Sequence, residues 1–416
     1  MTRKALLGLL GGLLLTGCGY RAPLFRSYIP EVADTTEYEG VRAAYQQLAA
    51  LMEKDTGLPP TEGNTVTLFP DAQKKREMLQ EDLEYAQEAV YVETGSVAAD
   101  LLREKAREGA DVRLILDRGA QKKAQPDQLA TLRADGVKLS VFHQPAMLID
   151  WVWPARGTHR DHRKIVLLDG QLGYIGGPNT ELRISGPAVA DLSAVYMENQ
   201  RRAAPHLPGV YVAKELEEAA RMDNIPELPQ FTDVTVQIVP DAPTDQRLPL
   251  RNGVEWAIGH AQKYFWFYNP CSPPPVTTLQ ALKDAAARGV DVRWTAPAQN
   301  EESIQKWMGE SLYRELLEAG VRIYEWQGPA LPATQLVTDD YLLAVGSASL
   351  DNLSFFLNYE AEALVYDEET ARYAASVYLS DLESHCREIT LEQVNAWSPF
   401  RKLRNWLTRH IGGAWG

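Results

Sequence analysis

Apolar and polar positions follow the same order twice along this chain of 416 residues. In the first half, a helical pattern over 97–109 leads into the continuous apolar run Ala110–Asp117, and in the second half Lys283–Trp294 repeats that order. Two further pairs of segments match in the same sequence: Ala134–Phe142 with Glu318–Trp326, and, without a gap, Ile165–Gly177 with Gln335–Ser347. Three matched pairs in one order predict an internal repeat.

Helix and strand alternate within each copy, which predicts an α/β fold of two pseudo-symmetric α-β-α sandwich domains, each with a partly parallel sheet. We expect the boundary between them in the proline-containing segment around Pro226 to Pro240. The expected organisation is a first domain over 61–225, a second domain over 226–396, a linker with an N-terminal helix over 19–60, and a C-terminal tail over 397–416.

The amino end has the pattern of an exported protein. A basic start precedes the uncharged apolar run Ala5–Leu15, which is too short to span a bilayer. The run is typical of a signal peptide over 1–18, and Leu15–Cys18 resembles the lipobox of bacterial lipoproteins, with Cys18 as the lipidated residue. An uncleaved membrane anchor is the alternative. Both place the rest of the chain outside the cytoplasm, and Gly19 favours the outer membrane if the envelope is Gram-negative.

Composition narrows the classes of function. The formal net charge of -14 argues against a general nucleic-acid binder, because affinity for a phosphate backbone depends on an excess of Lys and Arg. A chain with 45% hydrophobic and 24% charged residues suits two compact domains. Cys271 and Cys386 could pair in an oxidising envelope, and the sequence leaves that question open.

One motif carries the candidate chemistry: His162, Lys164 and Asp169 at the spacing H-x-K-x4-D, followed by Gly177 and Asn179. If 162–168 is a strand, the His and Lys project from one face and reach the same phosphate. Imidazole attack on a phosphodiester would give a phosphohistidine. Lys164 and the amide of Asn179 would neutralise the phosphoryl oxygens, and Gly177 lets backbone amides approach them. The scheme requires no metal and no cofactor.

The other polar residues near this motif receive more modest roles. Asp169 is an odd number of residues from His162, so we expect it to point away from the phosphate and to anchor a turn or a neighbouring element. His143 and His159 are expected to be ordinary residues at the rim, although His159 is close enough in sequence to be tested by mutation.

The two ordered repeats, together with the H-x-K-x4-D and G-G-x-N patterns, resemble the phospholipase D superfamily and, within it, most of all the cardiolipin synthases. The segments that carry the resemblance are 162–179, Arg183–Leu192, Gly289–Arg293, Gly346–Glu362 and Ile389–Trp397. It extends from about Val90 to Trp397. The resemblance implies two phospholipase D-like domains packed face to face, and a phosphatidyltransferase or phospholipase D-type phosphodiesterase that acts on phosphatidylglycerol or a related lipid.

The second half departs from that family at the positions that would touch phosphate. By alignment, Pro332 takes the His position, Thr334 the Lys position and Ser349 the Asn position, whereas Asp339, Gly346 and Ser347 match. Proline cannot transfer a proton and threonine carries no charge, so this half supplies neither the general acid nor the phosphate clamp.

Two carboxylates are candidates for orienting His162. The family often has a carboxylate at the place of Glu360 that orients the opposing His. After Asn179, the insertion that usually bears an orienting Asp is missing, and Glu181 could substitute for it.

Three interpretations remain open. The first is an enzyme in which His162 attacks, while His159, a water or a substrate hydroxyl protonates the leaving group. The second is a homodimer that pairs two His162 residues. The third is a non-catalytic phospholipid-binding or scaffolding lipoprotein of the same fold.

Membrane contact has a second source of support in the tail Phe400–Trp415, where Phe400, Leu403, Trp406 and Leu407 fall near one helical face. That helix could lie on an anionic membrane or pack on the domain. Likewise, Met147–Trp153 could rim an acyl-chain groove or belong to the core.

Overall fold

The protein was analysed as a computed structural model of the whole chain. The structure describes residues 35–69, 72–93, 97–117, 120, 126–142, 159–177, 181–205, 228–243, 246–270, 272–299, 303–328, 331 and 334–412. The chain divides into two compact units, 1–40 and 41–416. In the first unit the described residues, 35–40, are helical and begin α1 (Thr35–Thr56). All further elements belong to the second unit.

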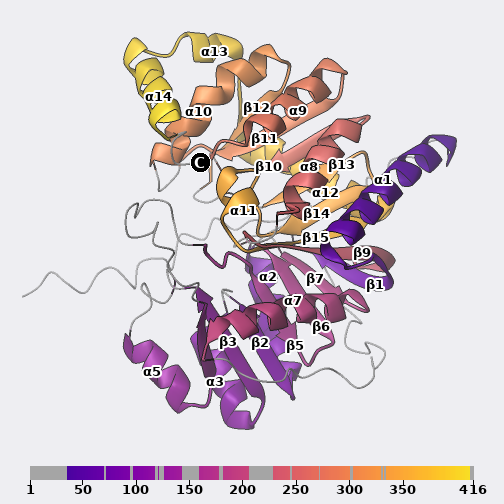
Figure 1. Cartoon of the computed structure of the whole chain (residues 1–416), viewed down its shortest axis with the longest axis vertical. Coiled ribbons are helices and arrows are strands. Elements are labelled where there is room, and N and C mark those ends of the chain that lie inside the picture. Colours follow the sequence, from indigo (N-terminus) through magenta and orange to yellow (C-terminus); the bar gives the residue numbers. More distant parts are fainter. Residues whose placement is uncertain are drawn as a thin grey trace, which may run out of the picture. The chain divides into compact units, whose positions relative to one another are not determined.

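A single mixed sheet runs through the described part of the second unit (Figure 1). From one edge to the middle, the order in the first half is β8 (Ala203–Ala204), β4 (Lys138–Phe142), β3 (Asp111–Asp117), β2 (Ala89–Glu93), β5 (Ile165–Leu168), β6 (Leu172–Gly176), β7 (Glu181–Ser185) and β1 (Thr61–Leu68). From the other edge, the second half has β16 (Cys386–Ile389), β12 (Arg322–Trp326), β11 (Asp291–Pro297), β10 (Tyr264–Tyr268), β13 (Gln335–Thr338), β14 (Leu342–Gly346), β15 (Glu360–Tyr366) and β9 (Phe231–Asp241).

The two halves therefore have the same strand order and meet where β1 pairs with β9, antiparallel. Within each half, three strands are parallel: β2, β3 and β4 in the first, and β10, β11 and β12 in the second. The remaining pairs are antiparallel. This arrangement confirms the predicted α/β fold with two pseudo-symmetric, partly parallel halves.

Helices cover both faces of the sheet. The first half has α2 (Ala72–Tyr85), α3 (Ala99–Glu108), α5 (Pro126–Ala134) and α7 (Ala188–Arg202), and the second half has α8 (Pro249–His260), α9 (Val276–Ala287), α10 (Ser303–Glu318), α11 (Asn352–Phe356), α12 (Glu368–His385), α13 (Leu391–Asn395) and α14 (Pro399–Gly412). One buried apolar cluster contains strand residues of both halves together with α7 and α12. Two further clusters lie on the outer faces, one under α2, α3 and α5 and one under α1, α8, α9 and α10. The shared central core holds the halves together.

The strand of the H-x-K-x4-D motif is shorter than the sequence suggests. We expected a strand over 162–168, but β5 begins at Ile165. The reason lies in the pairing: Asp161 instead forms an isolated parallel bridge with Tyr359 of the second half. The backbone around His162 thus pairs with the second half rather than with the strands of the first half.

Several sequence predictions fall wholly or partly outside the described residues. They concern the signal peptide with Cys18, the segment Met147–Trp153, His143 and Cys271. Cys386 is a half-buried free thiol, so a bond with Cys271 stays a matter of prediction. Among the helices that the structure describes, none combines the length and the apolar character needed to cross a membrane.

Candidate active site

His162 lies where the two halves meet. Its backbone N–H donates to the carbonyl of Tyr359 (2.9 Å), and the N–H of Tyr359 donates to the carbonyl of Arg160 (2.8 Å). This short pairing fixes the motif against the residue that precedes β15. As a result, the imidazole lies beside Glu360, the first residue of that strand.

The imidazole of His162 is held through its Nδ1 atom. Nδ1 is 3.0 Å from each carboxylate oxygen of Glu360 and 3.1 Å from the carbonyl oxygen of Ser347. Because both partners accept hydrogen bonds, Nδ1 holds a proton, and a ring that has given up its second proton has its lone pair on Nε2. Within the described parts of the chain, Nε2 has no hydrogen-bond partner, and the side chain is 41% exposed. This tautomer is the one needed for nucleophilic attack.

Glu360 is itself fixed by a set of donors. It is fully buried and accepts hydrogen bonds from the hydroxyls of Ser347 (2.5 Å) and Ser354 (3.0 Å) and from the amide of Asn358 (3.2 Å). Burial works to raise the pKa of Glu360, but the charge and hydrogen bond of His162, with help from Lys164 and Ser347, bring that pKa below its usual value. The carboxylate is therefore ionised beside the imidazole.

Lys164 lies on the same stretch of backbone. Its Nζ donates to the carbonyl oxygen of His162 (2.7 Å), and the side chain is half-buried. Burial lowers the pKa of Lys164, against the opposing charges of Glu360, Asp161 and Glu181. The ammonium thus lies beside the backbone of His162 and near enough to Glu360 for the two charges to interact.

Arg163, between His162 and Lys164, points the other way and links the halves. It is fully buried, and its guanidinium donates to the carbonyl oxygens of Glu360 (3.0 Å) and Asp241 (3.0 Å). This role could not be predicted from the sequence, since Arg163 does not belong to the spaced motif. Its contacts keep the start of β15 at the level of His162.

A pair of buried acids supports the same segment from the first half. Asp161 is 1% exposed, and burial raises its pKa to about 6. Burial also raises the pKa of Glu93 well above its usual range, with the neighbouring Asp161 adding to the shift. The amide of Asn199 donates to both carboxyl groups. Neither acid was singled out in the sequence.

Asp169 and its counterpart Asp339 hold turns rather than substrate. The carboxylate of Asp169 accepts the backbone N–H groups of 87–89 at 2.8 to 2.9 Å. Asp339 accepts those of 262–264 at 2.8 to 3.2 Å and also the hydroxyl of Tyr45 (3.1 Å). Both have a positive φ, 50° and 55°, which Asp tolerates better than most residues. Each one ties the β-turn of its repeat to the start of β2 or β10.

The degenerate motif faces the intact one. A Cβ added to Gly177 would lie 2.8 Å from the hydroxyl of Thr334, so the Lys-equivalent position packs directly on the glycine of the first motif. Ser347 contacts Glu360 as described above, and the backbone N–H of Ser349 donates to the hydroxyl of Ser354 (3.0 Å). Asn179 and Pro332 lie outside the described residues.

Glu181 has a different partner from the one considered for it. It forms a buried ion pair with Lys75, with Nζ 2.6 Å from the carboxylate and side-chain exposures of 3% and 5%. Burial raises the pKa of Glu181 against the lowering effect of Lys75 and Lys164. The carboxylate that contacts His162 is Glu360. His159 binds the carbonyl oxygen of Leu357 through Nδ1 (3.1 Å).

Motif spacing could locate His162 and Lys164 in the first repeat, and the two turn aspartates, Asp169 and Asp339, because these recur in both repeats. It could not reveal Arg163, Lys75, Asp161 or Glu93, whose partners are distant in sequence. Of these residues only Glu93 stands out in the sequence, as a charged group at the end of the apolar run 89–92.

Known proteins are similar to this chain over most of its length. Residues 255–382 match the family model described as cardiolipin synthase, PLD-like domain. Cardiolipin synthase 1 of Staphylococcus epidermidis is 28% identical over 362 residues, which cover 80% of this chain and 70% of that protein. The major cardiolipin synthase ClsA of Bacillus subtilis is 27% identical over 77% of this chain and 70% of its own. The crystal structure of phosphatidylserine synthase from Haemophilus influenzae has the same fold, with a TM-score of 0.65, 13% identity and coverage of 92% and 98%.

Proposed function

The chain belongs to the phospholipase D superfamily and is similar to its cardiolipin synthases, and from this premise we propose that it transfers or hydrolyses phosphatidyl groups of membrane phospholipid at His162. Phosphatidylglycerol or a related lipid is the substrate. The observation that carries the proposal is the contact of Glu360, from the second half, with Nδ1 of His162.

The contact determines which nitrogen reacts. With Nδ1–H bound to an ionised, buried carboxylate, Nε2 attacks the phosphorus of the substrate, a N–P bond forms and the P–O bond to the leaving alkoxide breaks. The positive charge that develops on the imidazole is stabilised by Glu360, and Lys164 neutralises the phosphoryl oxygens. An acceptor hydroxyl or water then attacks phosphorus and releases His162.

The second half has no histidine at the position that would protonate the leaving alkoxide, because Pro332 stands there. We propose that His159, a water or a substrate hydroxyl supplies the proton. A positioned general acid contributes about 10²- to 10⁴-fold, so the reaction is slower than in a protein with two complete motifs, and not abolished.

The test is to incubate the full chain with phosphatidylglycerol, separate the lipids, and repeat with His162→Ala. Cardiolipin or phosphatidic acid from the wild type, absent with the variant, supports the proposal. His260→Ala is the matched control, since His260 is an exposed histidine on α8 and should leave product formation unchanged. Headgroup binding without any product from the wild type would instead favour a non-catalytic lipid-binding protein.

We also propose that the protein works at a membrane surface outside the cytoplasm, attached through lipidated Cys18 and through α14. The support from α14 is its orientation. Two of its arginines and one amide turn inward: Arg401, Arg404 and Asn405 all donate to the buried Glu310 of α10 at 2.8 to 3.1 Å. Its apolar side chains turn outward, as the exposed fractions of Phe400 (77%), Leu403 (55%), Trp406 (54%) and Leu407 (40%) show.

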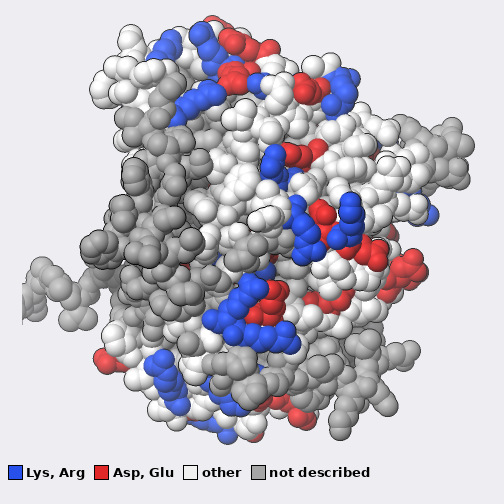
Figure 2. Space-filling view, viewed as in Figure 1, with Lys and Arg blue, Asp and Glu red and all other residues white. Residues whose placement is uncertain are grey.

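The charge of α14 suits an anionic surface. The helix carries Arg401, Lys402, Arg404 and Arg409 and no acidic residue, whereas the whole chain has a net charge of -14. Elsewhere on the face seen in Figure 2, acidic and basic side chains lie interspersed. In Figure 1 the helix lies beside α10 at one end of the second half. An exposed apolar face with cationic neighbours is the arrangement of helices that lie in a membrane interface.

A further inference from the structure

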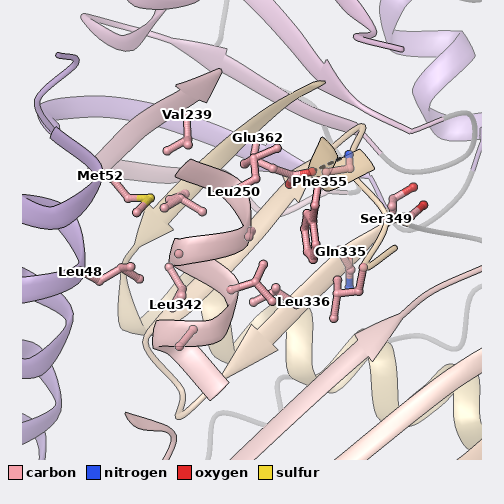
Figure 3. A pocket seen from close by; sticks show the side chains of 18 of the residues that line it. Leu48, Met52, Val239, Leu250, Gln335, Leu336, Leu342, Ser349, Phe355 and Glu362 are labelled. Carbon is pink, nitrogen blue, oxygen red and sulfur yellow. Dashed lines mark hydrogen bonds between the residues drawn. The ribbon is translucent and has the colours of Figure 1, made fainter. Parts of the chain in front are cut away.

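The degenerate motif of the second half has no cation where the intact motif has Lys164. Thr334 takes that position, and Ser349 takes the position of the Asn. Both line a small cavity in the core between α8 and the strands β13, β14 and β15, beside apolar side chains such as Phe355 (Figure 3). Its free volume is about 40 Å³, and the residues that line it include no Lys or Arg. A second cation for a phosphate at His162 therefore has to come from elsewhere.

The segment around His162 itself presents a further cation. Its odd-numbered residues, Asp161 and Arg163, are buried. The even-numbered ones are more open: Arg160 is exposed, and His162 and Lys164 are partly exposed. Such alternation marks extended backbone, in which every second side chain lies on the same face. That face carries three side chains in a row, with the imidazole between the guanidinium and the ammonium.

Arg160 is held in place at both ends. Its backbone carbonyl accepts the N–H of Tyr359 from the second half (2.8 Å). Its Nε and Nη2 atoms donate to one carboxylate oxygen of Asp117, at 3.1 and 2.8 Å. Asp117 is the last residue of β3, and its side chain is 3% exposed, whereas that of Arg160 is 52% exposed. The guanidinium is thus positioned from below and open to solvent above.

Most of the guanidinium is available to a ligand. A guanidinium has five N–H donors, and the contacts with Asp117 occupy only those of Nε and one of Nη2. Among the residues that the structure describes, none accepts from Nη1. Burial lowers the pKa of Lys164, and the charge of Arg160 adds to that lowering. The two cations are therefore close enough for their charges to interact, and one anion beside His162 is attracted by both.

We propose that Arg160 is the second cation of the phosphate site and donates to a phosphoryl oxygen of the lipid at His162, in the role that Thr334 cannot fill. The position of the phosphate is that of the proposed function, on which this inference rests. The planar N–H fork of a guanidinium matches the oxygens of a phosphate. Its charge also stabilises the negative charge that develops as Nε2 attacks. Because Asp117 already orients the side chain, little of its freedom is lost on binding.

The test measures phosphate binding at His162 without turnover. Diethyl pyrocarbonate modifies accessible imidazoles, and mass spectrometry of the peptides follows His162, whose side chain is 41% exposed. Glycerophosphoglycerol, the headgroup diester of phosphatidylglycerol without its tails, should protect His162 of the full chain in a saturable manner. The exposed His260 should stay unprotected. The concentration for half protection measures binding, and a wild type that shows no protection would contradict the inference.

Arg160→Gln should raise the concentration for half protection about 10- to 100-fold, the range for loss of a hydrogen bond between charged groups. Arg107→Gln is the matched control. Arg107 lies on α3, is 57% exposed and pairs with Asp135 at 2.9 Å, much as Arg160 pairs with Asp117. This variant should bind like the wild type. Equal protection of His162 in Arg160→Gln and in the control would overturn the inference.

A purely structural role of Arg160 is tested with Asp117→Asn. This variant removes the ion pair and keeps the guanidinium, so half protection should shift less than about threefold, below the effect of one charge interaction. If Asp117→Asn weakens protection as much as Arg160→Gln, the ion pair and not a contact with phosphate is responsible, and the inference is wrong. Should Arg160→Gln fail to fold with its buried partner unpaired, the double variant removes both charges and should show the loss expected for Arg160→Gln.

The inference and the proposed function fail in different ways. If the wild type forms no product from phosphatidylglycerol while protection of His162 depends on Arg160, the reaction is wrong and the phosphate contact stands. If the wild type forms product and Arg160→Gln is protected and turns over like the wild type, the contact of Arg160 with phosphate is wrong and the reaction stands.

Discussion

Two glutamates on one face of β15 have pKa values shifted in opposite directions, and the difference comes from their partners. Glu360 has His162 and Lys164 nearby, which bring its pKa below the usual value in spite of burial. Glu362, two residues on, has a backbone N–H, and burial raises its pKa well above the usual value. Sequence position alone gives no way to tell them apart.

This contrast predicts different effects of the same substitution. Glu360→Gln removes the charge that stabilises the imidazolium and can reverse the preferred tautomer of His162, so we expect lipid turnover to fall about 10²- to 10⁴-fold. Glu362→Gln alters a carboxyl group whose raised pKa favours the uncharged form and which does not contact His162, so it should change turnover less than about threefold, well below the contribution of one charge interaction. Initial rates of the two variants at pH 7 check this, and equal losses would contradict the role of Glu360.

A buried acid away from the site makes stability depend on pH. Burial raises the pKa of Asp381 to about 6, against the effect of the Tyr268 hydroxyl, which donates to it (2.6 Å). His385 (4.0 Å) and Cys386 are the other titratable groups beside it. The folded state therefore holds this proton more tightly than the unfolded state, whose Asp pKa is about 3.9, and the free energy of unfolding falls as pH rises between about 4 and about 6.

Asp381→Asn should remove that penalty while keeping an acceptor for Tyr268. We expect the variant to be more stable than the wild type by up to about 3 kcal/mol at pH 7.5 and equally stable at pH 4. Urea unfolding at both pH values measures the difference. Asp284→Asn, on the exposed surface of α9, should show no such pH-dependent gap.

At the level of elements, the turn aspartates connect strand pairs to the parallel part of each half. Asp339→Ala leaves three backbone N–H groups of 262–264 without their acceptor, so we expect a loss of at least about 3 kcal/mol in the free energy of unfolding. Asp340→Ala is matched to it, because Asp340 has the same φ of 55° but accepts from the Tyr264 side chain instead. If the two variants lose similar free energy of unfolding, the effect comes from the positive-φ backbone and not from the hydrogen bonds that Asp339 accepts.

The elements, and through the family resemblance His162, Lys164 and Glu360, could be predicted from the sequence, whereas the buried contacts that support them could not. The repeat located β3, β4, β5 and β6 with their counterparts because buried strands are continuous apolar runs. It missed where β5 begins, since Asp161 pairs with Tyr359, 198 positions away. The contact of His162 with Glu360 depends on the same pairing of halves. The sequence pattern shows the periodicity of apolar positions, but it does not show which distant segments of backbone pair.

At the level of the whole second unit, the symmetry of the fold contrasts with the asymmetry of its chemistry. The strand orders of the halves are the same, and Arg163 links them by donating to the backbone of β15 and β9. The first half keeps the H-x-K-x4-D motif and fills its outer core with the Asp82 network. The second half contributes the carboxylate of Glu360 that orients His162. The proposed site for a phosphate is thus built from both halves.

A lipid substrate must be taken from a membrane, and α14 offers the surface for that. Its four outward apolar side chains are 40% to 77% exposed, and burying them in a bilayer is worth several kcal/mol in total, on the order of 25 cal/mol per Å². The combined variant Phe400→Ser, Leu403→Ser, Trp406→Ser and Leu407→Ser should therefore bind vesicles at least about tenfold more weakly. The inward contacts with Glu310 are left intact, so the helix should stay folded on α10.

The measurement is co-sedimentation of the full chain with phosphatidylglycerol vesicles, in a Cys18→Ser background so that covalent lipid cannot hold the protein. Ile304→Ser combined with Leu353→Ser, at residues 59% and 39% exposed, is the control for the loss of surface apolar groups and should bind like its parent. Vesicles of phosphatidylcholine should bind more weakly than anionic ones, because Lys402 and Arg409 lie beside the apolar face. If the α14 variant and the control sediment alike, the membrane is not the partner of this helix, and a concentration-dependent change in mass by light scattering would then identify a second copy of the chain.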